Sequence, residues 1–421
     1  RSALHFQAPY AHAHGANAKP RLTPAVLLAR GALLLLCHLR IRPWTLISND
    51  WVCALTAPYA RHCAWGGAAL GGAAETWAHT LFLHLVHNLG QGYDGCLELP
   101  PATEPLAALH QLPAHLLAEG GRRLNLTRAA LLCCNAWATV SEGYREELLR
   151  TATLAPLLRS FGLPFACPLG LPLEETRKQL SERGLYGELG RRRAKAELQS
   201  ACFGSALDVP LVVFLGRITQ QKGVHLLLEC VPALLRACSG NVQLLVCGHA
   251  CAADAYGARC ARQISSLRSS YPQHFWASSL GRRFEDGRLV TAAADFGVMP
   301  SLFEPSGLVG EEFLAAGTPL VCADTGGMRD RVRAYDEVTR RGNGLLFTAN
   351  VHQSLLAALE RAAELYQSTE HYQALRAGAE AAARDVAETA CRWECELQRL
   401  HMCLAARRSR SVPGEFSQNR N

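Results

Sequence analysis

The chain has 421 residues, more than one ordinary domain needs, and 49 % of them are hydrophobic while 19 % are charged. This composition excludes a disordered chain and predicts two globular domains, each large enough to bury a core. The formal net charge of +7 is spread along the sequence, and arginines cluster only at residues 191–193 and in the tail at residues 407–410, which favours a small anionic ligand at most. We therefore expect no nucleic-acid partner.

Membrane insertion and disulfide bonds are also disfavoured. The most hydrophobic stretch, residues 25–41, carries two arginines and a histidine, so it is too short and too charged to span a bilayer. The 17 cysteines are irregularly spaced and include no C-x-x-C pair. We expect buried free thiols in a reducing compartment, with Cys391 and Cys395 in the core, and no membrane partner.

In chain order, the first half alternates short hydrophobic runs with helical patterns, as in α/β proteins with parallel sheets. Strands are predicted at residues 45–48, 81–86 and 136–140, and helices at residues 25–39 and 143–150. The second of these helices follows Ser141, whose hydroxyl can cap it. Residues 165–172 are predicted to form a loop and residues 174–200 a charged helix, with the hinge between two domains at this point.

A second series of buried strands begins after the hinge. These strands are predicted at residues 209–215, 242–246, 294–299, 320–323 and 344–347. Helical patterns of the length expected in βαβ units separate them, and residues 353–404 are mostly helical. The sequence thus predicts an α/β fold of two Rossmann-like domains facing across a cleft. Their bounds are residues 1–172 and 173–405, followed by a polar tail at residues 406–421.

Residues 215–223 read L-G-R-I-T-Q-Q-K-G, directly after the first buried strand of the second domain. A glycine at a strand end lets the backbone approach a ligand at the carboxyl edge of the sheet. Arg217 and Lys222 then offer two cations that can neutralise a diphosphate leaving group. The whole chain contains four lysines, so a lysine beside this turn favours a binding role over an ordinary surface position.

Residues 303–312 read F-E-P-S-G-L-V-G-E-E and follow the third predicted strand of that domain. A helix is expected at residues 308–316, ended by a glycine cap, and its first N–H groups are a ready site for hydroxyls or anions. Glu304 and Glu312 lie eight residues apart, and we interpret them as the functional pair. Glu311 is better interpreted as a glutamate on the helix surface.

Three ordered segments together resemble a known family: residues 216–223, residues 295–312 and the T-G-G run at residues 325–327. They resemble the retaining glycosyltransferases of the GT-B fold, and they look most like the starch and glycogen synthases of glycosyltransferase family 5. The first half agrees, because that family's motifs look like residues 49–51 (N-D-W), 87–88 (H-N) and 138–141 (A-T-V-S). The resemblance covers about residues 40–400.

The resemblance implies a hexosyltransferase that moves glucose from ADP-glucose or UDP-glucose to the non-reducing 4-OH end of an α-1,4-glucan. It implies retention of the anomeric configuration, with no metal and no cofactor. Carried over by motif, Arg217 and Lys222 would hold the diphosphate as it leaves. Glu304 would lie by the sugar, and Glu312 would bind the ribose. The other positions implied to line the nucleotide-sugar pocket are Ser306, Gly307, Leu308, Thr325 and Gly326.

In the first domain, the resemblance implies that the carbonyl or ring of His87 faces the anomeric carbon. His87 would then join Glu304, Arg217 and Lys222 as a catalytic residue, and Asp50 would shape the acceptor side. A metal site built on His84 and His87 is disfavoured, because residues three apart at a strand end point to opposite faces.

Two departures from the family pattern concern the first domain and the hinge. The family's K-x-G-G-L loop has no counterpart, and the chain begins with Arg1. We therefore expect about a hundred residues of the first domain to be missing. Any plastid-targeting segment would precede Arg1, and otherwise we expect a cytoplasmic protein. The family's P-N-G-I segment is P-L-G-L at residues 168–171, so Leu169 replaces an asparagine that could hydrogen-bond sugar hydroxyls.

Two alternatives therefore stay open. One is a GT-B transferase that acts on a small sugar or a lipid. The other is a degenerate, non-catalytic relative that binds glucan or partners a complete synthase. The absent loop and Leu169 favour the second alternative, whereas the intact Arg217, Lys222, Glu304 and Glu312 favour the enzyme.

Overall fold

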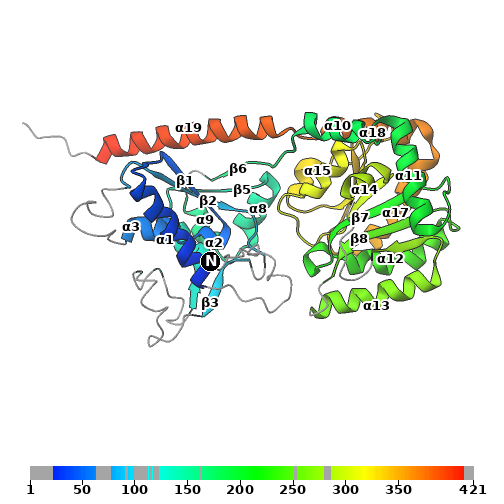
Figure 1. Cartoon of the computed structure of the whole chain (residues 1–421), viewed down its shortest axis with the longest axis horizontal. Helices are drawn as coiled ribbons and strands as arrows, with labels where there is room; N and C mark the ends of the chain where they lie inside the picture. Colours follow the sequence, from blue (N-terminus) through cyan, green and yellow to red (C-terminus); the bar gives the residue numbers. More distant parts are fainter. Residues whose placement is uncertain are drawn as a thin grey trace, which may run out of the picture.

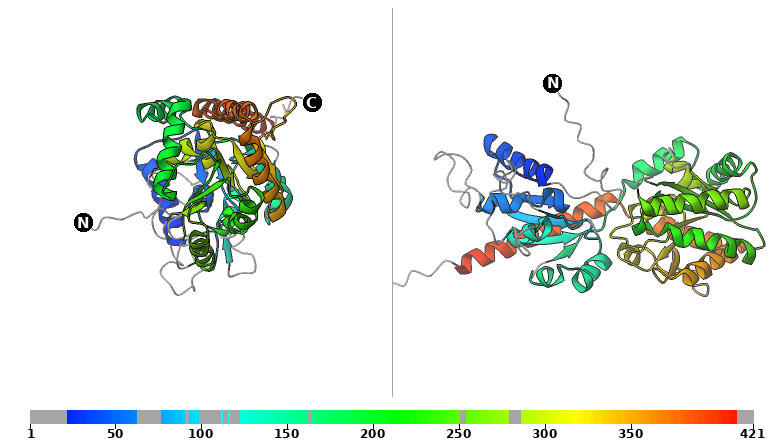
Figure 2. Two further views of the ribbon diagram at one scale, coloured as in Figure 1. Left: turned by 90° about the vertical axis from the view of Figure 1, so that its right-hand side faces the viewer. Right: turned by 90° about the horizontal axis from the view of Figure 1, so that it is seen from below.

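The computed structural model describes residues 22–62, 77–90, 93–98, 112, 116, 123–161, 164–250, 254–278 and 286–411. These residues form two α/β domains that lie side by side, each around its own parallel sheet (Figures 1 and 2). Hydrophobic strands separated by helices favour this arrangement, because helices can cover both faces of a parallel sheet. The predicted α/β architecture is confirmed.

The sheet of the first domain has four strands in the order β1-β2-β5-β6, and all its pairs are parallel. The strands are β1 (Thr45–Asn49), β2 (Leu81–Val86), β5 (Ala136–Thr139) and β6 (Phe165–Ala166). Every residue of β2 is buried, as the run L-F-L-H-L-V suggests for a central strand. A separate antiparallel ribbon pairs β3 (Cys96–Glu98) with β4 (Arg123–Asn125).

The helices before and between these strands cover one face of the first sheet. They are α1 (Leu22–His38), α2 (Asp50–Cys53), α3 (Thr56–His62), α7 (Leu126–Cys133), α8 (Glu142–Thr151) and α9 (Ala155–Arg159). Leu33 of α1, Tyr59 of α3 and Phe82 of β2 belong to one buried cluster on this face. The Ser141 hydroxyl accepts a hydrogen bond from the Tyr144 N–H at 3.1 Å, so the predicted cap of α8 is confirmed.

The second domain has a six-stranded sheet in the order β12-β11-β10-β7-β8-β9, and all its pairs are parallel. Its strands are β7 (Leu211–Arg217), β8 (Gln243–His249), β9 (Phe275–Ala277), β10 (Phe296–Met299), β11 (Leu320–Ala323) and β12 (Gly344–Phe347). Because β7 and β10 are neighbours in the middle of the sheet, the segments that follow them meet at its carboxyl edge.

Helices cover both faces of this second sheet. They are α10 (Leu173–Glu182), α11 (Gly187–Phe203), the 3-10 turn η1 (Gln220–Lys222), α12 (Val224–Ala237), α13 (Ala255–Ser270), α14 (Gly287–Ala293), α15 (Leu308–Ala315), α16 (Gly327–Arg331), α17 (His352–Gln367) and α18 (Thr369–Ala382). Two separate hydrophobic clusters lie on the two faces, one beneath α12, α13 and α17 and the other beneath α11, α14 and α15.

The chain returns to the first domain through α19 (Val386–Ser411), which runs along the first sheet (Figure 1). Leu400 is 1 % exposed and packs in a cluster with Leu83 and Phe165. The Trp393 ring meets the Phe165 ring edge to face, with centroids 5.4 Å apart. These contacts place residues 386–404 against the first sheet, although they lie within the bounds 173–405 that the sequence assigns to the second domain. The hydrophobic face of a helix does not specify which sheet it covers.

Three local expectations are wrong. Residues 165–166 form β6 at the edge of the first sheet, not a loop, and two residues are too few to leave a periodic pattern. The helix expected at residues 174–200 is interrupted between α10 and α11, where Gly184 and Gly187 have φ values of 65° and 74°. Cys391 and Cys395 are exposed on α19, because its buried face is built from other residues.

None of the helices in the described part of the chain combines the length and hydrophobicity that crossing a membrane requires.

Replacing Leu400 by alanine should lower the stability of the first domain by about 2–5 kcal/mol, because the change leaves a cavity between α19 and the sheet. The matched control is Met402→Ala, at a side chain that is 67 % exposed on the same helix. Thermal and denaturant unfolding of both variants checks this. Equal losses for the two would contradict the packing of α19.

Candidate active site

The residues that the sequence singles out follow the carboxyl ends of strands in both domains. Asp50 and His87 follow β1 and β2, while Arg217 ends β7. Glu304 follows β10, and Thr325 follows β11. The carboxyl edge of a parallel sheet is where open α/β folds bind ligands. The candidate site is therefore the region where these two edges meet.

A buried ion pair lies at the centre of the second domain's edge. The Lys222 ammonium contacts the Glu304 carboxylate, and the two side chains are 16 % and 6 % exposed. The Ser301 hydroxyl donates to the same carboxylate oxygen at 2.9 Å. The structure therefore brings together two of the predicted catalytic residues, in surroundings where their charges are little screened by water.

Close backbone packing makes this pair possible. Gly223 has a φ of +60°, and a Cβ there would lie 1.9 Å from the Pro300 carbonyl oxygen. The Leu302 N–H also donates to the Gln221 carbonyl at 2.8 Å. The turn that carries Lys222 is thus held directly against the segment that carries Glu304, which only a glycine at position 223 permits.

The T-G-G loop packs against the same segment from the other side. The Gly327 N–H donates to the Glu304 carbonyl at 2.8 Å. Gly326 has a φ of +45°, and a Cβ there would lie 2.2 Å from that carbonyl oxygen. Gly307, with a φ of +74°, is the N-cap of α15. Residues 306–308 therefore stand at the start of a helix, where N–H groups have no partner within the helix.

Glu311 is not the surface glutamate that the sequence suggested. It is fully buried, and its carboxylate contacts the Arg331 guanidinium. Arg331 also donates to the Ser306 carbonyl at 2.6 Å and to the Leu169 carbonyl at 3.0 Å. Burial lowers the pKa of Arg331 to about 10. Arg331 thus ties the E-P-S-G segment to the hinge, through the backbone of Leu169. Glu312, the predicted ribose ligand, is half-buried on α15.

In the first domain, Asp50 shapes the loop after β2. Its carboxylate accepts the His87 N–H at 2.7 Å and the Asn88 N–H at 3.3 Å. Asp50 itself has a φ of 51°, a conformation that persists in non-glycine residues only where surrounding contacts fix it. A Cβ on Gly90 would lie 2.3 Å from the Phe303 ring. The His87 loop therefore abuts the residue before Glu304, although no hydrogen bond joins His87 to Glu304 among the described residues.

Further contacts join the two domains beside the site. The Asp330 carboxylate caps the first turn of α8, accepting the Glu142 N–H at 2.6 Å and the Gly143 N–H at 3.0 Å. The Glu147 carboxylate accepts the Gly326 N–H at 2.8 Å and the Thr325 hydroxyl at 3.1 Å. The sequence does not reveal these contacts, because Glu147 and Asp330 look like ordinary helix-surface acids.

Arg217 reaches across the boundary as well. Its guanidinium donates to the Tyr93 hydroxyl of the first domain at 3.2 Å. His84, by contrast, is a core residue: its ring contacts the Ser48 hydroxyl at 2.9 Å, and burial lowers its pKa to about 4. It therefore stays neutral near pH 7. Within the described residues, no three His, Cys, Asp or Glu side chains are grouped so that they could hold a metal ion.

Comparison with known proteins identifies the family. Residues 3–160 match the starch synthase catalytic domain, and residues 197–381 match the glycosyl transferases of group 1. A glycogen synthase of Anaeromyxobacter dehalogenans is 31 % identical over 361 residues, covering 83 % of this chain and 71 % of the relative. The chain belongs to the glycogen synthase family. It is a hexosyltransferase that resembles glycogen and starch synthases.

Other relatives and solved structures agree. Glycogen synthase 2 of Geobacter sulfurreducens is 28 % identical over 361 residues, covering 82 % of this chain and 69 % of the relative. The catalytic domain of starch synthase IV from Arabidopsis thaliana, bound to ADP and acarbose, superposes with a TM-score of 0.74 at 21 % identity, covering 90 % of this chain and 77 % of that one. Sucrose-phosphate synthase from Thermosynechococcus elongatus gives 0.55 at 19 % identity, covering 91 % and 78 %. The fold is GT-B.

Removing the Glu147 carboxylate should free the T-G-G loop. In Glu147→Ala, we expect hydrogen–deuterium exchange at the Gly326 amide to be about tenfold faster, since one charge-assisted hydrogen bond is lost. Glu146→Ala is the matched control, because Glu146 is the exposed neighbour on the same helix. Mass-spectrometric exchange on peptides that contain residues 325–327 checks this. Unchanged exchange in Glu147→Ala would contradict the contact.

Proposed function

We propose that the chain transfers glucose from ADP-glucose or UDP-glucose to the non-reducing 4-OH end of an α-1,4-glucan, with retention of the anomeric configuration. The observation that carries the proposal is the buried Lys222–Glu304 pair beside the first amides of α15. Membership of the glycogen synthase family supports a glucan acceptor. The likeness to a starch synthase that was solved with ADP supports a nucleotide-sugar donor.

The donor is proposed to bind along the carboxyl edge of the second sheet. Arg217 and Lys222 meet its diphosphate, because an arginine fork and a lysine point charge both suit phosphate oxygens. The amides of Ser306, Gly307 and Leu308 add donors at the start of α15, where the helix dipole favours negative charge. The remaining proposed contacts are the T-G-G loop, at Thr325 and Gly326, and Glu312, which accepts hydrogen bonds from the ribose hydroxyls.

The reaction proposed is a front-face displacement that the leaving group assists. The bond from glucose C1 to the β-phosphate oxygen breaks, and a bond from C1 to the acceptor O4 forms on the same face of the sugar. The acceptor proton passes to the departing phosphate oxygen. Negative charge grows on the diphosphate during this step, and fixed cations and helix amides stabilise that charge without having to reorganise.

Glu304 and His87 are proposed to hold the glucose from its two sides. Glu304 accepts a hydrogen bond from a sugar hydroxyl while Lys222 faces the phosphate. The His87 loop, fixed by Asp50, presents its carbonyl or ring to the anomeric carbon. Asp50 thus acts as a positioning residue for the acceptor side. Contact between the domains keeps water away from the donor, which limits its hydrolysis.

The compartment proposed is the cytoplasm or a plastid. All 15 cysteines in the described residues are free thiols, and burial raises the pKa of several of them, including Cys133 and Cys167 to about 11 each. Thiols of this kind persist in a reducing environment.

The test measures incorporation of labelled glucose from ADP-glucose and from UDP-glucose into added glycogen by the full chain. Lys222→Met should lower kcat by about 10²–10³, the usual cost of removing one group that stabilises charge in the transition state. Glu304→Gln should also lower kcat, because the glucose loses a charged hydrogen-bond acceptor. Lys178→Met is the matched control, because this lysine is exposed on α10. The donor that gives the higher rate of incorporation identifies the nucleotide-sugar that the chain uses.

Three outcomes decide the proposal. Incorporation that the two site variants lose, and that Lys178→Met retains, would support it. Incorporation unchanged in Lys222→Met and Glu304→Gln would refute the site. Glycogen binding without incorporation from either donor would instead favour the non-catalytic relative.

A further inference from the structure

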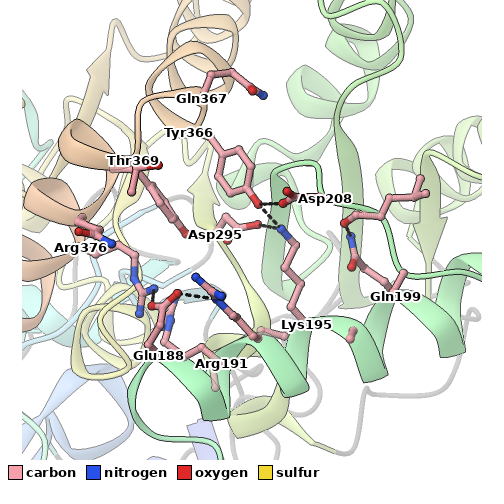
Figure 3. A pocket seen from close by; sticks show the side chains of 18 residues that line it. Glu188, Arg191, Lys195, Gln199, Asp208, Asp295, Tyr366, Gln367, Thr369 and Arg376 are labelled. Carbon is pink, nitrogen blue, oxygen red and sulfur yellow. Dashed lines mark hydrogen bonds and ion pairs between the residues drawn. The ribbon is translucent and has the colours of Figure 1, made fainter.

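A polar cavity lies in the second domain, away from the candidate active site (Figure 3). Its volume is about 580 Å³, large enough for a small organic ligand. Asp295, which lines it, accepts the Leu211 N–H at 2.8 Å, so the cavity adjoins the beginnings of β7 and β10. It therefore opens at the amino edge of the sheet, opposite the edge that carries Lys222 and Glu304.

One half of this cavity is a closed set of hydrogen bonds. Lys195 contacts the Asp295 carboxylate at 2.7 Å and donates to the Tyr366 hydroxyl at 2.8 Å. Tyr366 in turn donates to Asp208 at 2.9 Å, and Tyr372 donates to Asp295 at 2.6 Å. These groups satisfy one another, so they form a rigid wall that needs no ligand.

The other half carries three arginines and a single carboxylate. Arg191 is 6 % exposed and donates to the carbonyls of Ala316 and Ala294, which are neutral acceptors. Its Nε has no hydrogen-bond partner among the described residues. The nearby Asp295 carboxylate favours the charged form of Arg191, but Asp295 itself is paired with Lys195. Burial lowers the pKa of Arg191, and the nearby Arg376 lowers it further. A buried cation whose nearest carboxylate is shared with another cation is costly, and an anion in the cavity would offset part of that cost.

Glu188 is the one acidic side chain at this end. It bridges Arg192 and Arg376, each at 2.8 Å, and it is 51 % exposed. Partial burial alone would raise the pKa of Glu188, yet that pKa lies below its usual value because the two arginines favour the charged form. The arginine cluster therefore already stabilises one half-exposed negative group, which a stronger anion can displace toward solvent.

We propose that this cavity is a binding site for the phosphate group of a small phosphate monoester, separate from the site of glucosyl transfer. The phosphate lies against Arg191, Arg192 and Arg376, in the place that Glu188 now takes. Any hydroxyl-bearing part of the ligand extends toward Asp208 and Gln367, which line the same cavity.

The position of this site connects it to the candidate active site through α15. Arg191 donates to the Ala316 carbonyl, and Arg376 donates to the Gly317 carbonyl at 3.3 Å. Both carbonyls belong to the C-terminal end of α15, whose first amides face the candidate active site. A helix of eight residues is about 12 Å long, so an anion bound here contacts arginines that hold the far end of the helix whose first amides face the donor.

The test is calorimetric titration with inorganic phosphate, α-glucose 1-phosphate and glucose, in the presence of saturating ADP to occupy the proposed donor site. Arg192→Gln and Arg376→Gln should each weaken phosphate binding about tenfold, because each removes a charge-assisted contact. Arg193→Gln is the matched control, since Arg193 is exposed on the same helix and does not line the cavity. Arg192 is 74 % exposed, so its replacement should leave the fold intact, and melting curves check this.

Comparison of the titrated ligands distinguishes a phosphate site from a sugar-phosphate site. Equal affinity for inorganic phosphate and glucose 1-phosphate assigns a phosphate site, and tighter binding of glucose 1-phosphate assigns a sugar-phosphate site. Both outcomes support the proposal if they persist in Lys222→Met. Binding that Lys222→Met abolishes, or that Arg192→Gln and Arg376→Gln leave unchanged, overturns it, as does the absence of any phosphate binding. The measured quantity is phosphate binding while ADP fills the proposed donor site, so the result does not depend on glucosyl transfer.

Discussion

Burying a carboxylate lowers the stability of a protein by several kcal/mol unless a cation and hydrogen-bond donors contact it. The site is organised around this requirement at Glu304. Lys222 and Ser301 contact the Glu304 carboxylate, and the T-G-G loop donates a hydrogen bond to the backbone carbonyl of Glu304. Each partner arrives on a loop that follows a different strand. Close approach of these loops requires glycine at positions 223 and 326, where a side chain would collide with backbone oxygen.

At the boundary between the domains, buried or half-buried carboxylates are again paired with hydrogen-bond donors. Carboxylates of Asp330 and Glu147 accept amide hydrogens from the opposite domain, so each domain supplies acceptors for N–H groups that the other leaves unpaired. Such bonds are individually modest, and they can be made or broken as the domains approach or separate. Arg331 adds a fixed point at the hinge, where its buried guanidinium joins Glu311 to the backbone of Leu169.

The second sheet separates two kinds of chemistry at its two edges. The carboxyl edge gathers the ends of β7, β10 and β11, with the positive end of α15, and it suits a diphosphate donor. The amino edge gathers the starts of β7 and β10 and the negative end of α15, where arginines are favourable. One short helix therefore links the two edges, and its dipole matches the charges found at both ends.

Most strands and the order of the motifs can be predicted from the sequence, because buried runs such as residues 81–86 and 320–323 and the glycine-rich turns are local signals. The sequence also singled out Lys222 and Glu304, whose contact the structure then revealed. The pairing of residues far apart in the sequence, by contrast, depends on the three-dimensional fold. Glu311 looks exposed in a helical pattern but is buried against Arg331, and α19 covers the first sheet although it follows the second domain. Periodicity shows that a face is hydrophobic or charged, but the element it meets depends on the path of the whole chain.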